Sequence, residues 1–510
     1  DSCLVGSEMC IRDRSKALAG FKITPDLPGI EILEVKGWDY QSLMKTYSYA
    51  EKIAREHHIP VIIHVTELTQ PLGHSTSGSH ERYKSEERLK WEDDNDCNKK
   101  FEDWILKNKI STKKKIQSIK EEISLYVKDE KKLAWDHYQR PIKDSKKDLI
   151  QTINNLERTV NINEMNEMFS NLDDSNFSEL IEICRRLIYK LDSSDLNDRH
   201  SLINWKNKYM DILTNKYSTD LYSISIDSLS SIPKVLPMYS DEEKFVDGRI
   251  IIRDNFDKLL ENNSKIFIFG EDVGKIGDVN QGLEGLQKKH GKNRVFDTSI
   301  RESTIVGQGI GMSMRGLRPI AEIQYLDYIL YALQILSDDL GTLTYRTHGG
   351  QKAPLIVRTR GHRLEGIWHS GSPLGGMISF LRGVFILTPR NMTKAAGFYN
   401  TLLDIDQPGV VIEPLNGYRT KEQLPSNYGQ FKTPIGEIEI LKEGTDITLV
   451  SYGSTFNIVI NVAKEIEKYG ISCEVIDVQS LIPFDIKKEI SKSVIKTNRL
   501  LIIYEDLPGG

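Results

Sequence analysis

The sequence predicts an α/β protein with a parallel sheet, together with a long helical stretch. Short β-branched runs alternate with helical patterns over residues 242–504, an order that implies right-handed crossovers and parallel strands covered on both faces. A shorter helix and strand precede them within residues 40–66. Between these parts, residues 86–230 are dense in Lys, Glu and Asp, with apolar residues every three or four positions, which is typical of amphipathic helices.

Composition excludes several classes of protein. A chain of 510 residues is long enough for roughly two to four domains. Its formal net charge of −5 gives no electrostatic footprint for nucleic acid, and no run approaches the length of apolar sequence that spans a membrane. The five cysteines show neither paired nor metal-like spacing. They indicate a reducing compartment, and we expect a cytoplasmic location.

Both ends of the sequence look cut. Residues 1–14 (DSCLVGSEMCIRDR) do not begin with Met and lack the apolar core of a signal peptide. They resemble a translated sequencing adapter, so we interpret them as an artefactual leader. Residues 505–510 directly follow a predicted strand, and we therefore expect the native C-terminus to lie further on.

The first elements are a helix over residues 40–58 and a buried strand over residues 60–66. A polar loop with His74 and Ser75 follows. Loops after buried parallel strands often bind ligands, although a solvated turn is the alternative. Further on, the sequence predicts one amphipathic helix from Trp104 to Ile123 and a pair of helices over residues 161–189.

Prolines at 233 and 237 mark a boundary before the main α/β part. A helix over residues 242–261 begins that part, and a second unit begins near Pro434 with a helix over residues 454–469. The predicted strands of the two units cover residues 265–269, 319–324, 354–358, 384–388, 409–413, 446–451, 473–478 and 499–504.

Glu302 is the central candidate for a catalytic acid. It begins an apolar segment in which Gly307, Gly309 and Gly311 allow close backbone approach. An acid so placed is expected to be desolvated, which favours its protonated form and suits it to donate a proton to a ring nitrogen. The alternative is a helix-capping role favoured by the dipole, and the residues alone leave both open.

Residues 294–328 resemble the β half of the thiamine-diphosphate-dependent 2-oxo acid dehydrogenases, the first component of the pyruvate and branched-chain complexes. In that family an Asp-Thr-Pro-Ile-Ser-Glu run supplies the glutamate that hydrogen-bonds N1′ of the cofactor's aminopyrimidine, and Glu302 matches it within residues 297–302. Ser299 and Arg301 replace the common Pro and Ser. The resemblance implies a transketolase-like pyrimidine-binding domain and a C-terminal α/β domain.

Three further residues match the β half. Glu271 matches a second acid, which implies a path for a proton toward a paired active site; Tyr328 matches an aromatic platform for the aminopyrimidine; and His369 matches the proton donor for acyl transfer to a lipoyl thiol. The ordinary alternatives are a turn residue for Glu271 and a core aromatic for Tyr328. Nearby His362 competes with His369, which we prefer for its His-Ser dipeptide.

The loop at residues 70–83 resembles the Gly-His-Ser loop of the family's α half, where the histidine reaches the diphosphate, and His74 and Ser75 match by position. Gln70 stands where the family usually has Arg. The sequence contains no Gly-Asp-Gly, the start of the family's Mg²⁺ and diphosphate motif. We therefore predict no metal ligand within this chain, expect the Mg²⁺ site upstream of it, and expect the fragment to be inactive alone.

The predicted domains are the leader (1–14), a remnant of the α-half cofactor-binding domain (15–110), a helical linker region (111–235), a pyrimidine-binding β-half domain (236–430) and a truncated transketolase-like C-terminal domain (431–510). The chain thus resembles a fusion of the two halves.

The resemblance implies oxidative decarboxylation of a 2-oxo acid, branched-chain or pyruvate with the first favoured. The acyl group would pass to a lipoyl acyltransferase core, and the fused chain would form a homodimer. Two alternatives stay open at this point. One is ketol transfer of the transketolase or deoxyxylulose-phosphate-synthase type, and the other is a catalytically silent assembly module.

Overall fold

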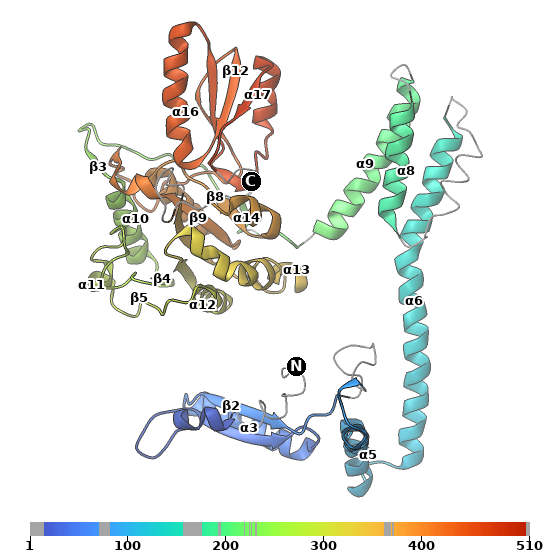
Figure 1. Cartoon of the computed structure of the whole chain (residues 1–510). Helices are drawn as coiled ribbons and strands as arrows, with labels where there is room; N and C mark the ends of the chain where they lie inside the picture. The colour runs from blue at the N-terminus through green and yellow to red at the C-terminus, as the bar shows by residue number, and fades with distance from the viewer. Residues whose placement is uncertain are drawn as a thin grey trace. The chain divides into compact units, whose positions relative to one another are not determined.

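The structure is a computed structural model that describes residues 15–70, 82–156, 176–191, 195–218, 220–223, 225, 227–229, 232–361, 369 and 372–505. The chain divides into two compact units, residues 1–205 and 206–510, which Figure 1 shows in blue to green and in green to red. We describe each unit by itself.

The first unit begins with a strand–helix–strand arrangement. Strand β1 (Glu31–Lys36) pairs in parallel with β2 (Val61–Thr66), and α3 (Tyr40–Glu56) connects them. Helix α3 starts where it does because the Asp39 carboxylate accepts a hydrogen bond from the Ser42 N–H at 3.0 Å. The helix and second strand confirm the expectation from sequence. Strand β1 was not predicted, because its alternating charges (EILEVK) leave it largely uncovered.

Three helices follow: α4 (Glu86–Asp94), α5 (Cys97–Lys107) and α6 (Lys113–Asn154). The prediction of a single helix from Trp104 to Ile123 is therefore wrong, since the first residue lies in α5 and the second in α6. Lys109 takes a left-handed backbone conformation (φ 56°) that ends α5. The Thr112 hydroxyl then caps the start of α6 by accepting from the Lys115 N–H at 3.3 Å.

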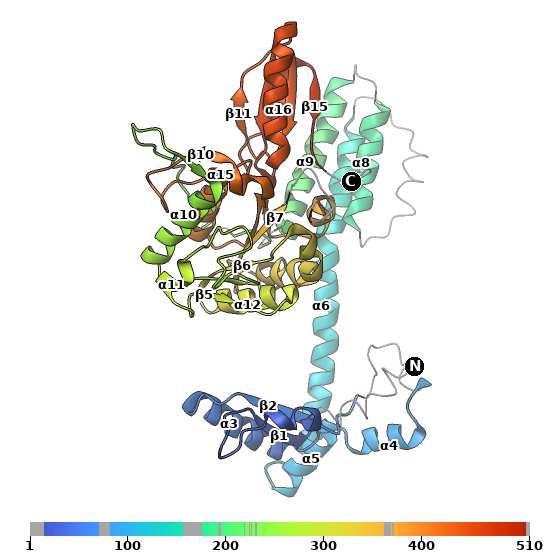
Figure 2. The ribbon, with the colours of Figure 1, turned by 60° about the vertical axis from the view of Figure 1, so that its left-hand side comes forward.

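Helix α8 (Phe177–Lys190) packs beside the C-terminal half of α6, as both Figure 1 and Figure 2 show. Ile142, Leu149 and Ile153 of α6 are buried there. Of the helix pair predicted over residues 161–189, only the part from Phe177 lies among the described residues. The α9 helix (Leu196–Ser218) follows α8.

The second unit is built on a seven-stranded sheet with the order β14-β8-β9-β7-β6-β4-β5. All neighbouring strands are parallel except the edge pair β14 and β8, which confirms the predicted α/β fold. The strands are β4 (Ile266–Gly270), β5 (Val295–Asp297), β6 (Arg318–Glu322), β7 (Ile356–Gly361), β8 (Phe385–Leu387), β9 (Gly409–Pro414) and β14 (Ser480–Ile482).

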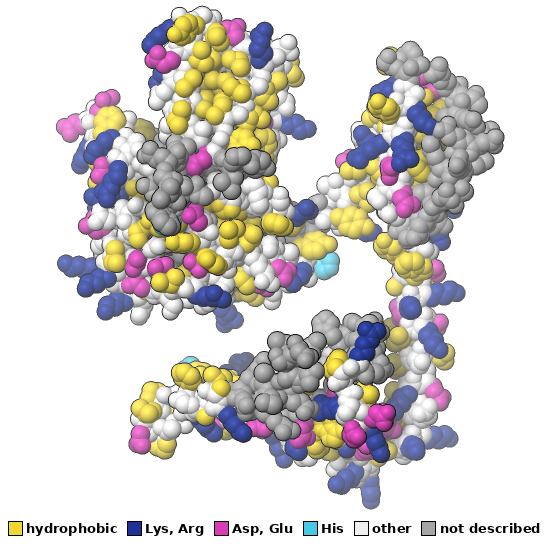
Figure 3. Space-filling view, viewed as in Figure 1, with side chains coloured by type: hydrophobic (Ala, Val, Ile, Leu, Met, Phe, Trp, Pro, Cys, Tyr) yellow, Lys and Arg dark blue, Asp and Glu magenta, His cyan; other side chains and the backbone are white. Residues whose placement is uncertain are grey.

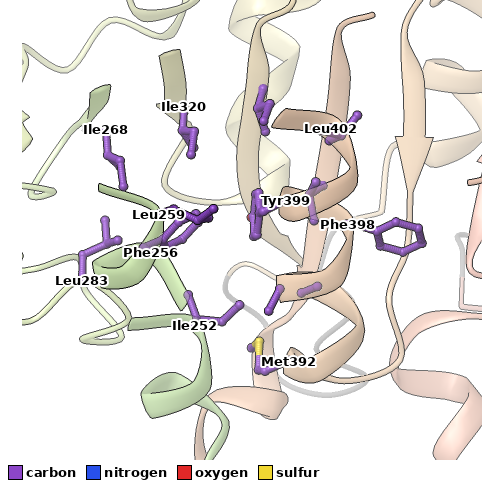
Figure 4. Packing of buried hydrophobic residues seen from close by; sticks show 14 of the residues in the cluster. Ile252, Phe256, Leu259, Ile268, Leu283, Ile320, Met392, Phe398, Tyr399 and Leu402 are labelled. Atoms are coloured by element: carbon purple, nitrogen blue, oxygen red, sulfur yellow. The ribbon is translucent and has the colours of Figure 1, made fainter. Parts of the chain in front are cut away.

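Helices cover both faces of this sheet. On one face α10 (Gly248–Asn262) and α15 (Met392–Asp404) bring Phe256 against Tyr399, with ring centroids 4.7 Å apart, as Figure 4 shows. On the other, α12 (Glu302–Met314) packs Ile305 and Val306 beside Leu326 of the 3₁₀ helix η4 (Leu326–Ala332). Successive strand residues alternate between the two cores. Buried apolar surface of this kind stabilises by about 25 cal/mol per Å².

Smaller elements complete this part. The helix predicted from residue 242 begins only at Gly248, because residues 245–247 form β3 (Phe245–Asp247), which pairs with β10 (Lys421–Gln423). The others are α11 (Leu286–His290), the π-helical turn η5 (Ile335–Leu340), α13 (Leu343–Arg346), α14 (Leu374–Phe380) and the 3₁₀ helix η6 (Leu415–Arg419).

A four-stranded sheet with the order β11-β13-β12-β15 forms the C-terminal part. Strands β12 (Ile447–Ser451), β13 (Cys473–Asp477) and β15 (Leu500–Ile502) are parallel, and β11 (Glu439–Lys442) is antiparallel. Helices α16 (Gly453–Ile466) and α17 (Glu489–Thr497) pack on this sheet. Between them the chain returns to the seven-stranded sheet as β14.

Positive and negative side chains are interspersed over the face shown in Figure 3. Among the residues that the structure describes, no helix combines the length and the apolar character needed to cross a membrane.

Candidate active site

The predicted β-half residues lie at the carboxyl ends of neighbouring parallel strands. Glu271 directly follows β4, and Glu302 follows β5 after a turn of four residues. Residues 323–325 follow β6 and lead into η4, which contains Tyr328. Because these three strands are adjacent in the sheet, their loops meet at one edge, where open α/β sheets place their ligands.

Glu302 is the first residue of α12, and Arg301 before it has an extended backbone without a side-chain cap. An acid in the first turn is favoured by the helix dipole. Its side chain is half-buried, less than the full burial that a desolvated acid requires. The Gly-rich sequence of the helix has one clear packing reason, since a Cβ at Gly309 would lie 2.6 Å from Leu355 Cδ1.

Glu271 lies in the electrostatic neighbourhood of Glu302. Burial raises the pKa of the Glu271 carboxyl, and the negative charges of Asp272 and Glu302 raise it further. The nearby negative charges therefore make it easier for the Glu271 carboxyl to keep its proton.

Tyr328 belongs to the same neighbourhood. Burial is the main cause that raises the pKa of its phenol, followed by Asp327 and Glu271, with a further contribution from Glu302. Glu271, Glu302 and Tyr328, which were predicted from separate motifs, therefore lie close enough for their charges to interact.

His369 completes the group. Its ring stacks on Tyr325 with centroids 3.7 Å apart and an interplanar angle of 6°, and it meets Tyr328 edge-on at 5.4 Å and 82°. Its Nδ1 lies 3.5 Å from Asp327 Oδ2. Within the described residues, neither His369 Nδ1 nor Asp327 Oδ1 has a hydrogen-bond partner, although both are buried. Such unmet polar atoms are uncommon and often mark functional sites.

Sequence reasoning missed Tyr325 and Asp327. Both stand in the Gln-Tyr-Leu-Asp-Tyr run around the predicted Tyr328, so an aromatic–acid–aromatic spacing was visible. Their contact with His369, more than forty positions along the chain, was not. The other predicted residues, His74 and Ser75, lie outside the described residues, as does the competing His362.

A buried ion cluster lies under the site. Arg358 of β7 bonds Asp278 at 2.8 Å and Glu413 at 2.9 Å and also pairs with Glu322, while Arg360 bonds Glu322 at 2.7 Å. All five side chains are fully buried. The phenol of Tyr418 adds a bond to each arginine at 3.0 Å. The cluster joins β6, β7 and β9 to the loop after β4.

Within the part of the chain that the structure describes, no group of three or more His, Cys, Asp or Glu side chains is arranged to hold a metal ion. A cavity of about 340 Å³ lies elsewhere, where residues 390–394 approach residues 431–439. Its central cations are already paired, since Arg390 and Lys394 both bind Glu439. The carboxylates at the sheet edge therefore remain the better candidate for chemistry.

Comparison with known families assigns three segments. Residues 16–143 match the family described as dehydrogenase E1 component, residues 246–421 match the transketolase pyrimidine-binding domain, and residues 436–510 match the transketolase C-terminal domain.

Individual relatives agree with these matches. The pyruvate dehydrogenase E1 component subunit beta of Acholeplasma laidlawii is 34% identical over 256 residues, which are 50% of this chain and 77% of the relative. The 2-oxoisovalerate dehydrogenase subunit beta of Bacillus subtilis is 32% identical over 49% of this chain and 76% of the relative. Subunit beta 2 of the mitochondrial 2-oxoisovalerate dehydrogenase of Arabidopsis thaliana is 37% identical over 49% and 70%.

Proposed function

Because this chain belongs to the family of 2-oxo acid dehydrogenase E1 components, we propose that it takes part in the oxidative decarboxylation of a 2-oxo acid and passes the acyl group to a lipoyl domain. The observation that carries the proposal is the meeting of Glu302, Glu271, Tyr328 and His369 at one edge of the sheet. The relatives are named for pyruvate and for 2-oxoisovalerate. We favour a branched-chain substrate and keep pyruvate as the alternative.

The residues present fit thiamine diphosphate, which the family implies. A half-buried carboxyl at a helix start lies near aromatic rings and beside buried polar atoms that lack partners. When bound, this cofactor supplies the carbon nucleophile that adds to the 2-oxo acid and accepts the electrons released with CO₂. Glu302 would hold the proton at N1′ of the aminopyrimidine, and Tyr328 would offer its ring as a stacking surface.

Two further residues handle protons. Glu271, with its raised pKa, is suited to hold a proton next to Glu302 and release it toward a paired site. His369 is suited to donate a proton while the acyl group moves to the lipoyl thiol, with Asp327 3.5 Å away to favour the ring orientation. His74 and Ser75 would contact the diphosphate. No step is assigned to Mg²⁺, whose ligands we expect upstream of this chain.

The family also suggests partners. E1 relatives act within multienzyme complexes, so we propose a lipoyl acyltransferase core as the receiving partner and a homodimer of the fused chain as the assembly. Among the cysteines that the structure describes, Cys97, Cys184 and Cys473, there is no disulfide. We propose a cytoplasmic location.

Glu302→Gln tests the proposal in a preparation that binds thiamine diphosphate and Mg²⁺. The amide cannot exchange a proton with N1′, so hydrogen exchange at C2 of bound thiamine diphosphate should slow by about 10²-fold or more, as measured by quenched NMR. Glu284→Gln, an exposed acid paired with Arg249 at 2.9 Å, is the matched control and should retain the wild-type rate.

Wild-type exchange in Glu302→Gln would contradict the proposed function. Ketol transfer is separated by a second assay on the same protein, since decarboxylation is followed with a dye acceptor and ketol transfer with phosphosugar donors. Turnover of the phosphosugars without decarboxylation would replace the proposal by the transketolase alternative.

A further inference from the structure

Two hydrogen bonds tie the loop that carries Glu271 to the strand that leads to Glu302. The Thr298 N–H donates to the Gly270 carbonyl at 3.0 Å, and the Gly274 N–H donates to Asp297 Oδ1 at 2.6 Å. The first bond lies just before Glu271 and the second lies three residues after it. Glu271 is therefore held between two points fixed on the end of β5.

The loop itself needs such support. Asp272 adopts a left-handed conformation (φ 58°), which is unfavourable for a residue with a side chain. Its carboxylate accepts from Gln324 at 3.3 Å and its carbonyl accepts from the Asp278 N–H at 2.9 Å. A turn of this kind keeps its shape only when several contacts determine it together.

Gly274 allows the tie to Asp297. A Cβ at this position would lie 2.6 Å from Asp297 Oδ2 and 2.4 Å from Gln287 Nε2, closer than real Cβ contacts. A side chain here would therefore displace the carboxylate. The glycine and the aspartate form one contact, and either can be changed to break it.

We propose that Asp297 is a positioning residue that fixes the distance between Glu271 and Glu302 by holding the Gly274 N–H. The inference deepens the proposed function, on which it rests, because it explains how the loop that carries Glu271 is held to the strand that leads to Glu302. Asp297 is itself exposed, so its carboxylate is not required to fill the core.

Three variants separate the bond from the charge. Asp297→Ala removes both the acceptor and the negative charge. Asp297→Asn removes the charge but keeps an oxygen that can accept from Gly274. Gly274→Ala keeps the charge but displaces the carboxylate. If the bond positions the loop, the first and third variants behave alike and the second resembles the wild type.

The first measurement is hydrogen exchange by mass spectrometry on the whole chain without cofactor. Peptides that cover residues 271–278 should exchange about tenfold faster in Asp297→Ala and Gly274→Ala, and close to the wild-type rate in Asp297→Asn. Peptides from α10 and α15 report whether the fold is intact. Unchanged exchange in Asp297→Ala, or an Asp297→Asn variant as fast as Asp297→Ala, would overturn the inference.

The second measurement is the pH dependence of C2 hydrogen exchange in bound thiamine diphosphate. Asp297→Ala should shift the midpoint of the profile and lower the rate about tenfold, while Asp297→Asn restores both. In a Glu271→Gln background, Asp297→Ala should have no further effect, since the group that it positions is gone. An equal loss in both backgrounds would show a general structural role and overturn the inference.

The proposed function and the positioning role of Asp297 can fail independently of each other. If Glu302→Gln exchanges C2 hydrogen at the wild-type rate, the proposed function falls. The loop exchange then still decides whether Asp297 fixes the Glu271 loop. If Glu302→Gln behaves as expected but loop exchange does not respond to Asp297→Ala, only the positioning role falls.

Discussion

Two groups of ionisable side chains lie at the same edge of the seven-stranded sheet and differ in how completely they are paired. The buried ion cluster around Arg358 and Arg360 is fully enclosed, and each of its acids binds an arginine. The group around Glu302 is half-exposed and contains buried atoms without described partners, on His369 and Asp327. The same residue types thus serve to hold strands together in one place and remain available for chemistry in the other.

The pKa values of the carboxyls also differ between the two groups. In the buried cluster, desolvation opposes ionisation of Asp278, but the charges of Arg358 and Arg360 outweigh it and lower the pKa of that carboxyl. At Glu271 no cation appears among the causes; burial and two neighbouring acids all raise the pKa. The two carboxyls thus differ in the charges that face them, since arginines favour the ionised form of Asp278 and neighbouring acids disfavour the ionised form of Glu271.

The largest expected effect comes from breaking the buried cluster. Arg358→Met leaves Asp278, Glu322 and Glu413 without their main counter-charge, so the free energy of unfolding should fall by about 3–5 kcal/mol. The measurement is urea unfolding followed by the circular dichroism of the chain. The matched control is Arg346→Met, whose ion pair with Asp338 lies at the surface and should cost about 1 kcal/mol or less.

Equal losses in the two arginine variants would break the comparison, because the enclosed cluster would then stabilise no more than a surface pair. A loss confined to Arg358→Met would sharpen it.

The sequence allowed much of the fold to be predicted. Alternating strand and helix patterns located the parallel strands β4, β6, β7, β8 and β9 and the C-terminal strands β12, β13 and β15, but not β5. It did not reveal β14, which is three residues long and pairs with a strand some ninety positions earlier. It also joined α5 and α6, because helical periodicity continues across a short break that depends on one left-handed residue and one cap.

The site was predicted only in part, for a related reason. Glu302, Glu271, Tyr328 and His369 were each recognised by a local motif. Asp327 and Asp297 act through contacts with distant segments, which no local pattern contains. The predicted strand ended at Arg358, and the burial of Arg358 and Arg360 was not predicted because Arg rarely occurs fully buried.

An intermediate effect is expected at His369. His369→Ala removes the proposed proton donor, so acylation of a lipoyl domain should slow by about 10²-fold while decarboxylation with a dye acceptor continues. Asp327→Asn should give a smaller loss, about tenfold, because the ring loses the group that favours its orientation. The control is His348→Ala, because the side chain of His348 is 94% exposed.

Loss of thiamine diphosphate binding in His369→Ala would contradict this role, since the histidine would then belong to the cofactor site. If the control variant slowed lipoyl acylation as much as His369→Ala, the loss could not be assigned to the stacked ring.

The smallest effect is a pH-dependent change in stability at Glu271. Its pKa in the folded chain is raised by burial, then by Asp272 and Glu302, so folding favours the protonated form. This contribution is fully present below the ordinary pKa of a glutamate, about 4.3, and is lost as pH rises through the folded value. Glu271→Gln cannot lose a proton. The thermal midpoint of Glu271→Gln should therefore be equal to or lower than that of the wild type at pH 4. At pH 8 it should be about 2 °C higher than that of the wild type.

Scanning calorimetry of both proteins at several pH values measures this gain, with Glu284→Gln as the exposed control. A difference in thermal midpoint that appears only as pH rises would sharpen the contrast between the two groups. It would show that repulsion among the acids of the site destabilises the folded chain. A difference that stays constant with pH, or that reverses its sign, would mean that the Glu271 carboxyl is as well compensated as the acids beneath it.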